Sequence, residues 1–261
     1  MDREAVLAAY DEQIRRRPQP DGPDGRVETD GAVVRQLSGA GGWSGVTWSG
    51  FDAATADAAV AAQVARFAEN GVPWEWKHHS HDTPPDLPGR LVAAGLVPEE
   101  PEALLVAEIA DLDLDVAAPA GVEVVTADDP EGVEMVVAVH DAAFGEDGSG
   151  LRGPLLRALD RPDAPVLGVV ALAGGEPVAA GRAEFHAGTD FASLWGGGTV
   201  PGWRGRGIFR ALVARRAALA AARGHRYLQV DALPTSEPIL ARLGFVRLAT
   251  TTPFTHPGRI A

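Results

Sequence analysis

Apolar and polar residues alternate through the second half of the chain in a pattern that predicts strands with helices between them. Two apolar runs meet at Gly174-Gly175, a dipeptide typical of a tight hairpin. An alanine-rich run that ends at Gly224 is typical of a helix closed by a glycine cap. The pattern predicts strands 122–125, 166–173, 177–186, 191–200, 227–232 and 245–252, helices 130–144, 151–159 and 208–223, and a short helix that ends at Gly244.

The first half shows a similar pattern with fewer clear elements. A helix carrying Leu7 and Tyr10 runs into the sequence RRRPQPDGPDG, which is typical of a linker. Further on, an alanine-rich run stops at Asn70-Gly71, as a helix does. The pattern predicts strands 33–37, 43–49, 72–79 and 103–109, a helix over 53–69, and a short helix that ends at Gly95.

The two halves share an order of parts. In each, an alanine-rich helix ends in glycine, and a strand, a short Leu-x-x-x-Gly helix and an apolar strand follow. This order indicates a duplication. We expect an α/β (α+β) fold with a mixed, mostly antiparallel central sheet flanked by helices in two lobes. The predicted domains are a helix and linker over 1–26, a first lobe over 27–115 and a second over 121–261, with the boundary in 110–121.

Composition excludes several classes of chemistry. With no cysteine, the chain has no disulfides and no thiolate nucleophile or metal ligand. Lys77 is the only lysine and follows no glycine-rich loop, which argues against a P-loop and against Schiff-base catalysis. No apolar run approaches the roughly 20 residues that a membrane helix needs, and the N-terminus lacks a secretion signal. We expect a cytoplasmic protein that does not contact membranes.

Charge is distributed unevenly along the sequence. The chain carries a formal net charge of -13, yet no acidic residue lies between Asp190 and Asp231. An acid-free segment in so acidic a chain indicates a local site for an anion. This segment holds seven arginines: Arg204, Arg206, Arg210, Arg215, Arg216, Arg223 and Arg226.

The sequence VPGWRGRGIF at 200–209 is the strongest candidate for that site. A strand that leaves through Pro201, turns on glycines and enters a helix near Ile208 presents several backbone N–H groups that the helix itself does not bond. With the positive end of the helix dipole they suit a phosphate or diphosphate. The alternative is a plain tight turn before a surface helix.

The segment TVPGWRGRGIFRAL at 199–212 resembles the acyl-CoA loop of the GCN5-related N-acetyltransferases (GNAT), in which Arg or Gln is followed by two residues, Gly, one residue, and Gly or Ala. Arg204 and Gly207 match this pattern, whereas Phe209 replaces its last small residue. The run EPILARLGF at 237–245 is similar to the short helix of the family and its Leu-Gly-Phe ending. The resemblance covers about half of the chain and implies a tandem arrangement whose first copy is degenerate.

The resemblance implies an enzyme that transfers an acetyl group from acetyl-CoA, as co-substrate, to a primary amine of a small molecule by direct attack. Main-chain groups at Gly198, Thr199 and Val200 are expected to hold the pantetheine arm. The alternative is a module that binds or senses acyl-CoA without catalysis. The residues expected at the diphosphate are Arg204, Gly205, Arg206, Gly207, Ile208, Phe209 and Arg210.

Two carboxylates are candidate catalytic residues. Glu184 lies where family members often keep a base, and Asp231, at the end of a strand, is suited to hold the cationic amine. The usual tyrosine acid of the family is replaced by Leu240. We expect no metal, because the histidines near residue 80 are divided between two faces of a strand, and no nucleic-acid partner, because the acidic remainder repels a polyanion. A monomer or homodimer is expected.

Overall fold

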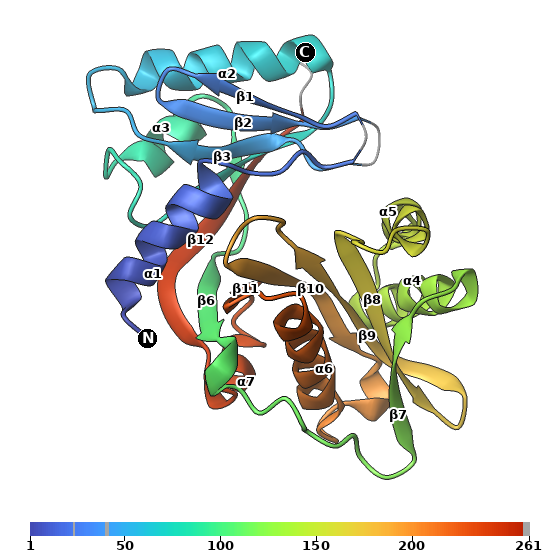
Figure 1. Cartoon of the computed structure of the whole chain (residues 1–261). Coiled ribbons are helices and arrows are strands. Elements are labelled where there is room, and N and C mark those ends of the chain that lie inside the picture. The colour runs from blue at the N-terminus through green and yellow to red at the C-terminus, as the bar shows by residue number, and fades with distance from the viewer. Residues whose placement is uncertain (23, 40–41, 258–261) are drawn as a thin grey trace. The chain divides into compact units, whose positions relative to one another are not determined.

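The computed structural model describes residues 1–22, 24–39 and 42–257, which form two compact units (Figure 1). Unit 1 comprises Met1–Leu104, Asp231–Glu237 and the chain from Arg247; unit 2 comprises Leu105–Val230 and Pro238–Val246. The division therefore falls at Leu104 and does not coincide with the boundary expected in 110–121. These units are defined by how residues pack and not by which segments fold or evolve as domains. The domain ranges 1–26, 27–115 and 121–261 therefore stay a prediction.

Unit 1 contains a mixed sheet in the order β1-β2-β3-β4-β12, with β5 also paired to β12. The β3–β4 pair is parallel and the other neighbours are antiparallel. The strands are β1 (Arg26–Asp30), β2 (Val33–Leu37), β3 (Gly45–Ser49), β4 (Trp74–His79), β5 (Val97–Pro98) and β12 (Val246–His256), and β6 (Glu102–Glu108) leads into unit 2. The helices are α1 (Arg3–Tyr10), a π-helical turn (Asp11–Arg15), α2 (Ala56–Asn70) and α3 (Leu87–Ala93).

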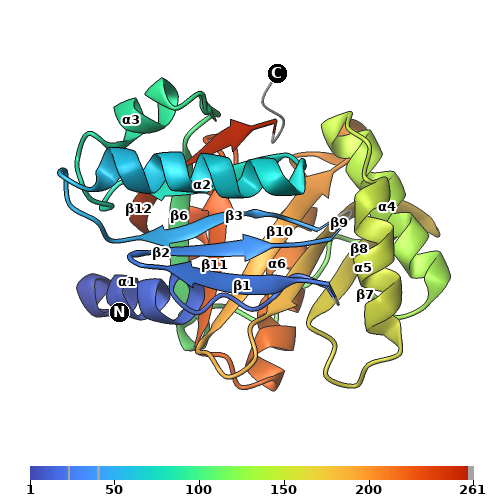
Figure 2. The same cartoon turned by 90° about the horizontal axis from the view of Figure 1, so that it is seen from above.

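The core of unit 1 lies between α2 and the sheet (Figure 2). Val60 and Phe67, seven residues apart on one face of α2, pack with the strand residues Val46 and Trp74. The rings of Phe67 and Trp74 stack with centroids 4.3 Å apart. Burial of these large side chains removes apolar surface from water, which is the main stabilising contribution in a domain of this size.

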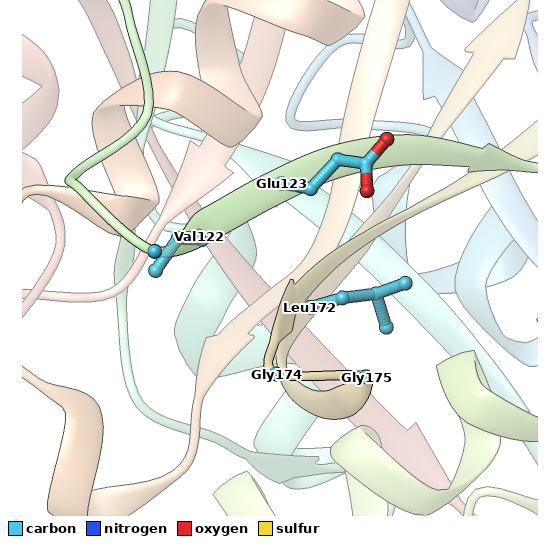
Figure 3. Close-up of a pocket in the computed structure, with 6 residues that line it drawn as sticks. Val122, Glu123, Leu172, Gly174 and Gly175 are labelled. Carbon is cyan, nitrogen blue, oxygen red and sulfur yellow. The ribbon is translucent and has the colours of Figure 1, made fainter.

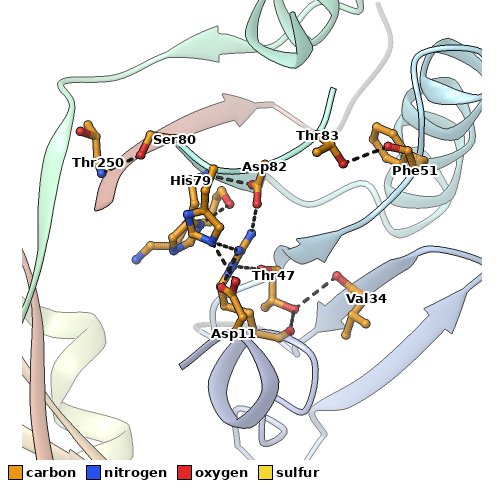
Figure 4. A network of polar contacts seen from close by, with 12 residues as sticks. Asp11, Val34, Thr47, Phe51, His79, Ser80, Asp82, Thr83 and Thr250 are labelled. Atoms are coloured by element: carbon orange, nitrogen blue, oxygen red, sulfur yellow. Dashed lines mark hydrogen bonds and ion pairs between the residues drawn. The ribbon is translucent and has the colours of Figure 1, made fainter. Parts of the chain in front are cut away.

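A network of charged side chains surrounds Arg15, at the end of the π-helical turn. The buried guanidinium of Arg15 donates to Asp11 (2.7 Å), to Asp82 (2.6 Å) and to the backbone oxygen of Thr47 (3.1 Å). Asp82 in turn accepts from the backbone N–H of His79 at 2.9 Å. Figure 4 shows Asp11, Thr47 and Asp82 converging on this cation from the π-helical turn, β3 and the segment after β4. The network ties the N-terminal helix to the sheet.

Unit 2 contains the antiparallel strands β7 (Val122–Ala127), β8 (Val166–Ala173), β9 (Glu176–Phe185) and β10 (Phe191–Thr199), with β11 (Tyr227–Ala232) parallel to β10. Its helices are α4 (Pro130–Phe144), α5 (Ser149–Leu159), α6 (Ile208–Ala222) and α7 (Glu237–Arg242), with 3-10 turns at Ile109–Asp111 and Pro201–Trp203. Figure 1 shows α4 and α6 running along this sheet.

Strand alternation divides the core of unit 2 between two faces of the sheet. Val170 and Ala180 pack in the cluster formed by α4 and α5, whereas their chain neighbours Val169 and Ala179 pack against α6. The sheet is therefore covered on both faces. This arrangement places the end of α4 and the start of α6 on opposite sides of β10.

The fold class predicted from the sequence is confirmed: a mixed, mostly antiparallel sheet flanked by helices. The patterns also give the bounds of β2, β8, α4 and β11 as the structure has them. They miss β1, because its sequence RVETD lies at an edge and has little apolar alternation. The closing strand reaches His256 rather than residue 252, because β4 and β5 pair with its polar end.

Candidate acyl-CoA site

A bulge in β10 forms one side of the candidate site. The register between β10 and β9 shifts between Trp195 and Gly198, and Gly196 adopts a positive φ of 56°. Parallel pairing with β11 covers only Phe191 to Ser193 within the described chain, although β10 continues to Thr199. Main-chain groups beyond Ser193 are thus left without a β11 ladder partner among these residues.

Glycines allow the flanking helices to approach the bulge closely. A Cβ on Gly198 would lie 2.8 Å from the Cβ of Ala143 and 2.9 Å from the ring of Phe144, both at the end of α4. On the other face, a Cβ on Gly197 would lie 2.9 Å from the ring of Phe209. Phe209 therefore packs beneath the bulge from the first turn of α6.

The loop before α6 has the conformation that its glycines permit. Gly205 and Gly207 have φ of 75° and 85°, in the left-handed region that other residues rarely adopt. No side chain caps the helix. Among the described residues, no hydrogen bond is found from the backbone N–H groups of 205–210. These amides and the helix dipole form a site with the polarity that an anion requires.

The arginines of this loop divide into two kinds. Arg204 donates through Nε to the backbone oxygen of Thr199 (3.0 Å) and through Nη2 to that of Ala143 (3.0 Å), so it ties the loop to β10 and α4. Arg206 lies over the ring of Trp203, 4.5 Å from its centroid, and donates to Gly202. Arg206 and Arg210 are exposed beside the uncapped amides and are placed to add positive charge there.

The three main-chain groups predicted for the pantetheine arm are not equally available. The N–H of Val200 already donates to the oxygen of Val178 at 3.0 Å, and the oxygen of Thr199 accepts from Arg204. Gly198, at the bulge, is paired with Ala180 of β9. The groups that face away from β9 are therefore the ones suited to a ligand.

The two predicted carboxylates lie in different units. Glu184 is in unit 2, on β9, with its Oε1 3.3 Å from Nε of Arg182. Asp231 is in unit 1, where its fully buried side chain lies 2.5 Å from Nζ of Lys77. Burial of Lys77 favours the neutral amine, but the charge of Asp231, its hydrogen bond to Lys77 and the other acidic groups nearby together outweigh burial and raise the pKa of Lys77 above its usual range. The second oxygen of Asp231 has no hydrogen-bond partner among the described residues.

Sequence reasoning missed two buried polar features of unit 2. Ser193 lies 2.6 Å from Nε2 of His186 and accepts from Nε2 of Gln229 at 2.6 Å. Burial lowers the pKa of His186 to about 4, so its ring is neutral at neutral pH. No sequence signal points to this trio. The second feature is Arg216, whose spacing of four from the buried Leu212 is a helical signal for an inward position.

Leu240, at the position of the family's tyrosine, is 1% exposed and lies on the buried face of α7. A hollow of about 370 Å³ lies elsewhere in unit 2, at the start of β7 and the β8–β9 hairpin (Figure 3). None of the predicted site residues lines it. Its lining residues are Gly121, Val122, Glu123, Leu172, Gly174 and Gly175.

Within the described ranges, no cluster of three or more His, Asp or Glu side chains is arranged to hold a metal ion. In the same residues, no helix has the length and apolar character needed to cross a bilayer.

No family model and no curated protein matches the sequence. Solved structures do match. A GCN5-related N-acetyltransferase from Kribbella flavida has a TM-score of 0.72 and 21% identity, with 98% of this chain and 96% of that chain covered. One from Sphaerobacter thermophilus has a TM-score of 0.63 and 15% identity, covering 99% and 86%. A tandem GNAT protein from the clavulanic acid biosynthesis pathway has a TM-score of 0.60 and 12% identity, covering 92% and 85%.

At these identities the similarity concerns the fold. The resemblance to the GNAT fold, predicted from the loop at 199–212, is confirmed at that level. The degenerate nature of the first copy stays a prediction.

Proposed function

We propose that this chain, which has the fold of GCN5-related N-acetyltransferases, transfers an acetyl group from acetyl-CoA to a primary amine of a small molecule. One observation carries the proposal: the uncapped amides at the start of α6 lie next to a glycine bulge in β10, so that a diphosphate site and an open strand edge occur in the same unit.

Each part of the site has a role in this proposal. The amides of 205–210, with Arg206 and Arg210, bind the diphosphate. Arg204 keeps the loop in place through its bonds to Thr199 and Ala143. Unpaired main-chain groups from Gly198 to Val200 hold the pantetheine arm. Bound acetyl-CoA supplies an activated thioester, and holding it against the amine accounts for much of the rate.

The amine nitrogen attacks the thioester carbon, and the C–S bond then breaks to release the CoA thiolate. The amine must lose a proton, and we assign that proton to Glu184, directly or through water, because Glu184 shares unit 2 with the loop. Asp231 is the second candidate, with the role of attracting the amine, although Lys77 already neutralises part of its charge. Water protonates the thiolate, because the aliphatic side chain of Leu240 has no acidic proton to donate.

Buried Leu240 also favours the second candidate function, a module that binds acyl-CoA without turnover. The acidic surface favours a cationic acceptor. A cytoplasmic location and a monomeric or homodimeric state complete the proposal.

Titration calorimetry with CoA, followed by thiol release from acetyl-CoA with a panel of primary amines, tests both candidates. Binding with amine-dependent release supports the transferase. Binding without release from any amine supports the sensor. Absence of binding contradicts both. The Arg206→Ala, Arg210→Ala double variant should weaken CoA binding at least tenfold, whereas Arg215→Ala, which removes an exposed arginine one turn further along α6, should not.

A further inference from the structure

Arg216 is a buried cation on the inner face of α6. Its side chain is 1% exposed and, within the described chain, forms no ion pair with a carboxylate. Two backbone oxygens accept its protons: that of Leu212 from Nε (3.1 Å) and that of Arg182 from Nη1 (3.3 Å). Burial, with the nearby Arg182 charge, lowers the pKa of Arg216 to about 10.

Two glycines on neighbouring strands make room for this guanidinium. A Cβ on Gly181 of β9 would lie 2.7 Å from its Nη1, and a Cβ on Gly197 of β10 would lie 3.3 Å from its Nη2. Gly197 is inside the bulge between Trp195 and Gly198. The cation therefore lies against the bulge, next to the main chain from Gly198 to Val200 that is proposed to hold the pantetheine arm.

The charge is unfavourable for folding. A buried cation without a carboxylate partner loses its hydration, and two carbonyl bonds replace only part of it. An apolar side chain of similar size would stabilise the fold equally well or better. The presence of this charge is explained if it acts on a ligand bound at the β10 bulge, which the guanidinium contacts.

We propose that Arg216 is a positioning residue that fixes the β10 bulge and places a positive charge beneath the reacting thioester, an inference that rests on the proposed acetyl transfer. Its bond to the Arg182 oxygen holds β9 in register while Nη2 supports Gly197. As the amine nitrogen bonds to the thioester carbon, negative charge collects on the carbonyl oxygen. That charge is attracted to the cation below until the C–S electron pair leaves with sulfur.

Arg216→Met tests this proposal, with Arg215→Met as the matched control. Arg215 is the adjacent arginine, exposed and bonded only to the hydroxyl of Thr126 among the described residues. For Arg216→Met we expect kcat to fall about 100-fold, KM for acetyl-CoA to change less than threefold, and the melting temperature to stay constant or rise. A purely structural arginine would instead lower the melting temperature, and that result, or an unchanged kcat, contradicts the proposal.

Hydrogen exchange in the absence of CoA gives a readout that does not depend on activity. The amides of Gly196 to Gly198 should exchange at least tenfold faster in Arg216→Met than in Arg215→Met. Equal exchange in the two variants overturns the positioning role even if the wild-type protein shows no turnover. Failure of wild-type CoA binding instead overturns the proposed function, and the exchange result still decides whether Arg216 fixes the bulge.

Discussion

The two alanine-rich helices α2 and α6 have the same length, 15 residues, and neither has a side-chain cap, but the turns before them differ. Before α2, Asp52 accepts hydrogen bonds from the N–H groups of Ala54 and Thr55, both at 3.0 Å. Before α6, Gly205 and Gly207 place no acceptor at the amides. The turn before α2 is satisfied by a carboxylate of its own chain, whereas the amides at the turn before α6 are left for an anion from outside.

The buried arginines differ in the same way. Arg15 of unit 1 is bonded to two carboxylates, whereas Arg216 of unit 2 has only carbonyl partners among the described residues. The buried cation of unit 1 is therefore neutralised by carboxylates of the same unit. The region around α6 retains positive charge and free donors, which is the expected state of a site that binds an anionic ligand.

The largest expected effect follows from breaking the Arg15 network of Figure 4. Arg15→Met leaves Asp11 and Asp82 without their cation, and Asp82 is buried. We expect a loss of about 3–5 kcal/mol in the free energy of unfolding, measured with urea. Arg16→Met, which removes only an exposed cation 4.0 Å from the Trp48 ring centroid, should cost about 1 kcal/mol or less. Equal losses would show that the buried pairing contributes nothing.

The two glycines with positive φ next to α2 and α6 offer a matched pair. Gly71 ends α2 with φ 64°, and Gly207 precedes α6 with φ 85°. Alanine at either position should cost about 1–2 kcal/mol in stability. Only Gly207→Ala should also weaken CoA binding, by about 30-fold or ~2 kcal/mol in calorimetry, because its Cβ enters the anion site. A similar loss of affinity in Gly71→Ala would argue against the loop as the binding site.

The neutral trio of unit 2 predicts a dependence on pH. The unfolded His186 has a pKa near 6.5, and the folded one is lowered to about 4, so the unfolded state binds more protons between these values. Stability should therefore fall as pH decreases from 6.5 to 4. In His186→Gln, which keeps a hydrogen-bonding side chain, we expect the total loss of unfolding free energy between pH 6.5 and 4 to be about 2 kcal/mol smaller than in the wild type. Urea unfolding at several pH values measures this difference. An unchanged slope would assign the acid sensitivity to other groups, such as buried His79.

The smallest effect concerns the turn that precedes α2. Asp52→Ala removes the acceptor for two backbone N–H groups of this turn and should lower the melting temperature slightly. CoA binding should stay unchanged. A stability equal to that of the wild type would mean that water satisfies the two amides of this turn as well as the carboxylate does, and the contrast with the turn before α6 would lose its energetic meaning.

The sequence predicts most elements of unit 2 because their signals are local. A continuous apolar run defines β8, alanines define α6, and the loop at 199–212 carries its own motif. Arg204 shows the limit of such signals. The motif predicts it as a ligand for the diphosphate, but its bonds to Thr199 and Ala143 depend on segments 5 and 61 residues away along the chain.

The same limit applies to the candidate catalytic residues. Asp231 is predicted to hold the cationic amine, but its partner Lys77 lies 154 residues away in the sequence. The inward position of Arg216 was within reach of helical periodicity, but the two glycines that accommodate it lie on β9 and β10. Long-range pairing of this kind is set by tertiary packing, which propensity and motif do not encode.

The interleaved course of the chain has a practical consequence for dissection. Cutting in 110–121, the domain boundary expected from the sequence, would separate β4 from β12, its antiparallel partner over Thr251 to His256. The N-terminal fragment would then present β4 as an open edge prone to aggregation. Exchanging C-terminal halves between homologous chains would likewise transplant a strand that completes unit 1.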